Sequence, residues 1–160
     1  MRWFRFAVLI LLATILQASF LANLNIKPDL LLILLVFFSI YCNPSDAIIS
    51  SFTIGFAADL VGSTMGPQMI SFGLFGTMLA YLHRFIAIRK MPYQSLAIFI
   101  TALLSGYLAY FLSFLKGEPT PPNIFTVVFG ISLYSCLVGP FLFLPSAWWM
   151  RIRVNRFGRH

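Results

Sequence analysis

The fold is decided by residues 27–66, which read KPDLLLILLVFFSIYCNPSDAIISSFTIGFAADLVGSTMG. This stretch contains two apolar runs, residues 29–42 and 47–62, separated by a polar break at Asn43-Pro44-Ser45-Asp46. Both runs are shorter than the roughly 20 apolar residues that cross a 30 Å hydrocarbon core. We therefore expect two short helices embedded in a membrane.

Four further apolar runs lie around this stretch, at residues 6–24, 67–88, 93–115 and 124–149. Proline is favoured in the first turn of a helix, where its missing N–H leaves no bond unmade. A proline stands at the start of each of the last five runs: Pro28, Pro44, Pro67, Pro92 and Pro122. The pattern predicts an all-α integral membrane protein, one domain over residues 1–160, with six transmembrane helices of which the second and third are short.

The composition excludes an ordinary soluble domain. Of the 160 residues, 60% are apolar and 9% are charged, against about 45–50% and about 25% in soluble globular domains. Intrinsic disorder is excluded by the same numbers, because it requires low hydrophobicity and high charge.

The net charge of +7 is explained by its distribution along the six runs. With the N-terminus in the cytoplasm, nine cations fall inside: Arg2, Arg5, Arg84, Arg89, Lys90, Arg151, Arg153, Arg156 and Arg159. Lys27 and Lys116 fall outside. This asymmetry follows the positive-inside rule and predicts both termini in the cytoplasm, without nucleic-acid binding. Arg2 and Arg5 before an apolar run also suit a signal peptide, but the run is long and we expect a retained span.

Asp59 is the strongest candidate for a functional polar residue within the predicted spans. It shares a helical stripe with Ser51 and Gly55, and Ala58 and Gly62 fall on the same face. Small residues allow helices to approach closely in lipid, so Asp59 is expected to face protein or a cavity. Two alternatives stay open: a ligand or partner contact, or a structural acid that caps the start of the fourth helix or pairs with a neighbouring helix.

The remaining polar residues indicate structure rather than chemistry. Asp29 and Asp46 each stand at a predicted helix start, where the helix dipole favours a carboxylate. Cys42 and Cys136 lie in apolar runs and are expected to remain free thiols. The sequence contains no GxSxG, HExxH or P-loop motif, no carboxylate pair and no metal-ligand spacing, so we expect neither enzymatic activity, nor a cofactor, nor a metal.

Two segments together resemble the bacterial rod shape-determining protein MreD family. The first is Lys27-Pro28-Asp29-Leu30-Leu31-Leu32, and the second is Gly55-Phe56-Ala57-Ala58-Asp59-Leu60 followed by the turn Gly62–Gly66. The motif match covers residues 27–81, and the remainder agrees in its span pattern. The candidate partner-binding, ligand-binding or structural positions are Pro28, Asp29, Gly55, Phe56, Asp59, Leu60, Gly62 and Gly66.

The resemblance implies a non-enzymatic component of the cell-elongation machinery in the bacterial inner membrane. It implies binding to the single-span protein MreC, and through it indirect contact with MreB, RodA and a penicillin-binding transpeptidase. It also implies a fold similar to the substrate-binding subunits of energy-coupling-factor transporters. The alternative function is therefore a vitamin-like small-molecule binding subunit of a membrane transporter.

Overall fold

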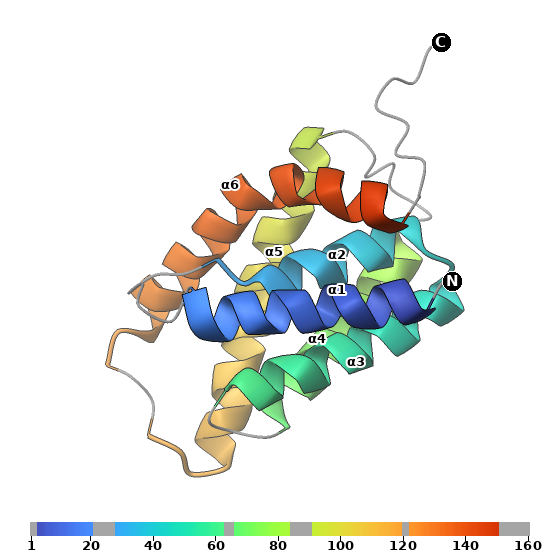
Figure 1. The fold of residues 1–160 in the computed structure, drawn as a ribbon. Helices are drawn as coiled ribbons and strands as arrows, with labels where there is room; N and C mark the ends of the chain where they lie inside the picture. Colours follow the sequence, from blue (N-terminus) through green and yellow to red (C-terminus); the bar gives the residue numbers. More distant parts are fainter. Residues whose placement is uncertain (1–2, 21–27, 63–65, 84–90, 120–121, 151–160) are drawn as a thin grey trace.

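The computed structural model describes residues 3–20, 28–62, 66–83, 91–119 and 122–150, and these contain helices and no strand. The elements are α1 (Trp3–Ile15) with the π-helical turn η1 (Leu16–Phe20), α2 (Leu30–Tyr41), α3 (Pro44–Val61), α4 (Pro67–Leu82), α5 (Met91–Leu115) and α6 (Ile124–Met150) (Figure 1). The all-α prediction is confirmed. The ends predicted at residues 24 and 88 for the first and fourth runs lie outside the described residues.

Two of the described helices are long and apolar enough to cross a membrane, Pro92–Leu115 and Ile124–Met150. Two more are apolar but shorter, Trp3–Ser19 and Leu30–Tyr41. The stretch that forms α3 and α4 carries small and polar residues on the faces where these helices meet, which lowers its hydropathy. The six-span topology therefore remains a prediction from the sequence.

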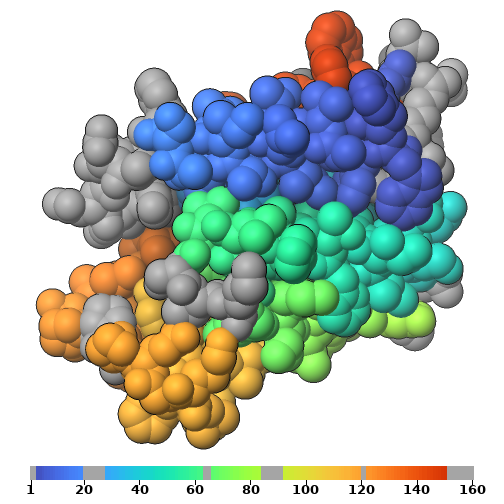
Figure 2. All heavy atoms as spheres, turned by 60° about the horizontal axis from the view of Figure 1, so that its bottom comes forward, coloured from blue at the N-terminus to red at the C-terminus, as the bar shows by residue number. Residues whose placement is uncertain are grey.

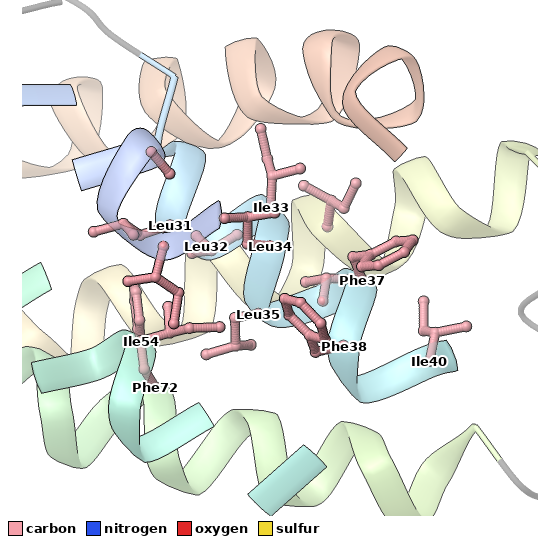
Figure 3. Close-up of a cluster of buried hydrophobic side chains, with 14 of the residues drawn as sticks. Leu31, Leu32, Ile33, Leu34, Leu35, Phe37, Phe38, Ile40, Ile54 and Phe72 are labelled. Atoms are coloured by element: carbon pink, nitrogen blue, oxygen red, sulfur yellow. The ribbon is translucent and has the colours of Figure 1, made fainter. Parts of the chain in front are cut away.

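Helix α2 forms the centre of the bundle. Every residue from Leu31 to Ile40 is buried, and a helix that is apolar on all sides is stable only inside a packed or lipid environment. Figure 3 shows its side chains facing Ile54 of α3 and Phe72 of α4. The face in Figure 2 shows α1 and α3 side by side, outside α2. All five other α-helices contact α2, which explains its continuous apolar sequence.

Helices α3 and α4 form a tight antiparallel pair because glycines lie between them. A Cβ atom at Gly55 would stand 2.7 Å from the Cα atom of Met69, a distance that real Cβ atoms do not show. At Gly76 a Cβ atom would collide with the side chain of Ser51. The predicted small-residue stripe of α3 is thus its contact face with α4, as expected for helix pairs in lipid.

The outer surface of the bundle is apolar. On α3 the side chains of Phe52, Phe56 and Leu60 are exposed, and α6 exposes Phe125, Phe141 and Trp148 among others. Such contiguous apolar surface is unfavourable in water and is favourable against acyl chains. The exposed faces therefore agree with a bilayer around the bundle.

The start of α1 and the end of α6 lie at the same end of the bundle (Figure 1). The indole Nε1 of Trp149 donates to the carbonyl of Arg5 at 3.3 Å, and the Arg5 guanidinium donates to the carbonyl of Trp149 at 3.4 Å. These reciprocal bonds place the two helix ends on one side, as the predicted topology requires.

We predict that Gly55→Ala destabilises the protein although alanine favours helices. Its Cβ atom meets backbone, which cannot move aside alone, so separating α3 from α4 should cost about 1–3 kcal/mol. The measurement is the thermal unfolding midpoint in detergent.

Gly62→Ala is the matched control, because the nearest atom to its Cβ would be 3.5 Å away. An unchanged midpoint for Gly55→Ala would contradict the close approach of the two helices. A fall for Gly62→Ala equal to that for Gly55→Ala would contradict it as well.

Candidate functional site

Asp59 caps the helix that follows its own. Its carboxylate accepts three backbone N–H bonds from the first turn of α4: Gly66 to Oδ2 at 2.9 Å, Gln68 to Oδ1 at 3.0 Å and Met69 to Oδ2 at 3.0 Å. The first N–H groups of a helix have no partner within the helix, and the N-cap Gly66 has no side chain to supply one. Asp59, near the end of α3, supplies these acceptors instead.

This geometry supports the structural alternative for Asp59. The residue is 3% exposed, and both carboxylate oxygens already accept hydrogen bonds from α4. The negative charge also faces the positive end of the α4 dipole, which stabilises it in a buried place. Gly66 has φ +113°, a conformation that L side chains rarely adopt, so glycine is required where the chain turns into the cap.

Asp29 is the N-cap of α2, as predicted, and it joins three elements. Its Oδ1 accepts from the backbone N–H of Leu32 at 3.1 Å and from Nε2 of Gln17 at 3.2 Å. The Gln17 Oε1 accepts from the N–H of Leu31 at 3.3 Å. The N–H of Asp29 donates to Oγ of Ser135 at 2.9 Å. The start of the central helix is therefore held by η1 and α6, and the π-helical turn places Gln17 for this contact.

The start of α3 also follows the prediction. Asn43 is the N-cap, Pro44 occupies the first helical position, and Asp46 lies in the first turn. Asp46 lies at the end of the bundle opposite to Asp29 and Asp59. We name the end with Asp29 and Asp59 the outer end, because the charge distribution predicts that it faces out of the cell.

A cavity of about 340 Å³ lies at the outer end, and we name it the outer cavity. Its walls come from the start of α2, the α3–α4 turn, the second half of α5 and the first half of α6. The lining residues are Asp29, Leu32, Gly62, Pro67, Gln68, Phe72, Ala102, Ser105, Gly106, Ala109, Tyr110, Ser113, Glu118, Pro119, Val128 and Ile131. This volume lies within the range of small-molecule sites.

Glu118 reaches the outer cavity through a glycine-based helix end. The N–H of Gly117 donates to the carbonyl of Phe114 at 2.9 Å. The N–H of Glu118 donates to the carbonyl of Ser113 at 3.2 Å. Gly117 has φ +78°, so these bonds form a Schellman motif. Gly117, two residues after the apolar run ends at Leu115, is the sequence signal that the chain folds back here.

The eight predicted site residues fall into three groups. Asp29 and Gly62 line the outer cavity. Gly55, Asp59 and Gly66 form the α3–α4 joint. The others are Pro28, which is buried before α2, and Phe56 and Leu60, which are 49% and 56% exposed on α3. The structure thus brings two of the eight to the cavity and directs two to the outer surface, so the motif residues do not form one pocket.

The described residues contain no group of three or more His, Cys, Asp or Glu side chains that could hold a metal ion. Cys42 and Cys136 are free thiols. Sequence reasoning had not singled out four cavity residues, Gln68, Ser105, Tyr110 and Ser113. They lie in long apolar stretches, and only the packing of α4, α5 and α6 brings them together.

A comparison with protein-family models finds that the model for the rod shape-determining protein MreD matches residues 1–152. No curated protein matches the chain. No solved structure matches it either.

We predict that Asp59→Ala lowers the free energy of unfolding by about 2–3 kcal/mol, because three N–H groups of α4 lose a charged acceptor. Asp59→Asn should lose less, since one oxygen remains to accept. The measurement is the thermal unfolding midpoint of each purified variant.

Asp46→Ala is the control, since it removes a carboxylate from the first turn of another helix. It should cost about 0.5 kcal/mol. The capping role is wrong if Asp59→Ala unfolds at the wild-type midpoint.

Proposed function

Because the chain belongs to the MreD family of rod shape-determining proteins, we propose that it is a non-enzymatic membrane component of the bacterial cell-elongation complex. Family membership gives it a role in determining rod shape. We propose further that it binds an MreC-like single-span protein and helps position peptidoglycan synthesis. Its contacts with MreB, RodA and a penicillin-binding transpeptidase are then indirect. The match over residues 1–152 is the observation that carries this function.

The proposed location is the inner membrane, with several spans and both termini in the cytoplasm. The nine-to-two distribution of cations supports this orientation. The hydrogen bonds between Arg5 and Trp149 support it as well, because they hold the start of α1 and the end of α6 together. Lys116 follows α5 at the other end, close to the cavity residue Glu118.

The proposed partner contact lies on α3. Phe52, Phe56 and Leu60 stand four residues apart and are 42–56% exposed, so they form one apolar ridge. The adjacent face of α3 holds α4 through Gly55 and Asp59, and the Phe52 end of the ridge packs over Gly73 of α4. The ridge is therefore presented in a fixed direction within the membrane, where a single partner helix could pack along it.

The test is co-expression with the MreC-like protein of the same organism and affinity purification in mild detergent. Wild-type protein should retain the partner in a constant ratio. The double variant Phe56→Ala with Leu60→Ala should retain about tenfold less, because a combined loss of about 1.4 kcal/mol of interface energy lowers the affinity tenfold.

The matched control is Leu74→Ala with Leu137→Ala, two exposed positions on α4 and α6. It should retain the partner as wild type does. Absence of the MreC-like chain from the wild-type preparation contradicts the proposed function. Equal losses in both double variants contradict the placement on α3.

A second candidate function is the vitamin-binding subunit of a transporter, with a fold similar to energy-coupling-factor subunits. The outer cavity is the observation that favours it, since its size suits a small molecule. This function predicts a stoichiometric vitamin-sized ligand in mass spectra of the protein purified from its host. Spectra without such a ligand would exclude it.

A further inference from the structure

Several polar side chains of the outer cavity have no hydrogen-bond partner among the residues that the structure describes. The side chains of Gln68, Tyr110, Ser113 and Glu118 line it and make no hydrogen bond or ion pair with any residue in the described part of the chain. Each of the four side chains is partly exposed in the cavity, so its polar atoms are accessible to water or to a ligand. These four therefore have bonding capacity that a ligand could use.

The charges around the outer cavity favour a cation. Two helices begin at the cavity, α2 and α4, and their first N–H groups are already bonded to Asp29 and Asp59. These helix ends therefore do not offer a site for an anion. The C-terminal end of α5 also lies at the cavity and carries the negative end of a helix dipole. Glu118 adds a negative charge there, and the described lining residues include no Lys, Arg or His, although Lys116 stands two residues before Glu118 in the same turn.

The rest of the wall is apolar. Leu32, Phe72, Val128 and Ile131 line the cavity beside the polar group. A small hydrated cation would lose its water against these side chains without compensation. A ligand with a charged head and an apolar stem matches both parts of the wall.

We propose that the outer cavity binds the ammonium head of an amphiphile. Glu118 pairs with the ammonium, the Tyr110 hydroxyl and the Gln68 amide oxygen accept its remaining N–H bonds, and the apolar wall receives the stem. Two sources offer this chemistry at an outer membrane surface: the ethanolamine headgroup of a phospholipid and a free alkylamine. This inference rests on the cavity and not on the binding of an MreC-like protein.

The test is native mass spectrometry of the delipidated full-length protein in detergent, titrated separately with palmitoyl-oleoyl phosphatidylethanolamine, palmitoyl-oleoyl phosphatidylglycerol and decylamine. Wild-type protein should take up one phosphatidylethanolamine in preference to phosphatidylglycerol. Glu118→Gln should reduce this uptake about tenfold, because a hydrogen bond to a charged group is replaced by a neutral one.

Ala109→Leu provides an independent variant, since it fills the cavity without touching a charge. Tyr110→Phe should weaken uptake to a smaller extent. The controls are Tyr134→Phe, an exposed tyrosine on α6, and Asp46→Asn, which removes one charge at the opposite end. Both controls should bind as wild type does. Each variant is first checked for a monodisperse elution and an unchanged helical circular dichroism spectrum.

The outcomes separate the two sources. Preferential uptake of phosphatidylethanolamine that both Glu118→Gln and Ala109→Leu reduce supports the lipid headgroup. Uptake of decylamine with the same dependence, but no phosphatidylethanolamine, supports a free amine. The proposal is overturned by phosphatidylglycerol binding as well as phosphatidylethanolamine, by uptake that neither variant changes, or by the absence of any adduct.

Discussion

The carboxylate of Asp59 is the interaction on which the rest of the structure depends. It lies in the last turn of α3 and caps α4, since its two oxygens accept the first N–H groups of the next helix. The bonds fix the turn, and the fixed turn sets the register in which Gly55 faces the backbone of Met69. This register directs Phe56 and Leu60 away from the pair. The buried Asp59 carboxylate thus fixes which face of α3 packs against α4 and which face is exposed.

Hydrogen bonds from polar side chains at helix starts also organise the outer end of the bundle. Asp29 caps the start of α2 as Asp59 caps the start of α4. Asp29 is also hydrogen-bonded to Gln17 of η1 and to Ser135 of α6. Each of these polar groups is hydrogen-bonded at the start of a helix. The side chains of Tyr110 and Glu118, further along the cavity wall, do not bond the start of a described helix. The outer cavity therefore lies beside two carboxylates that cap helices, and its wall also carries polar groups that have no partner among the described residues.

The sequence predicted local features well, and it predicted contacts between distant segments poorly. Helix starts at Pro44 and Pro67 and the cap at Asp29 were predictable, because each depends on a few neighbouring residues. The small stripe of α3 correctly indicated a contact face, but its partner was not identifiable from spacing alone. The cavity was not predictable, since Gln68, Tyr110 and Glu118 meet only through the packing of α4 and α5. Phe56 and Asp59 are three residues apart and share one side of the helix, so only the packing of α4 explains why Asp59 is buried while Phe56 and Leu60 are exposed.

Backbone amide exchange at Gly66, Gln68 and Met69 tests the central claim most directly. The amides at the start of a helix normally exchange fast, because they lack partners within the helix. Measured by nuclear magnetic resonance on wild-type protein in detergent, these three should exchange as slowly as amides in the middle of α4. Fast exchange at all three, with protection confined to the later turns of α4, would contradict the claim that Asp59 joins the two helices.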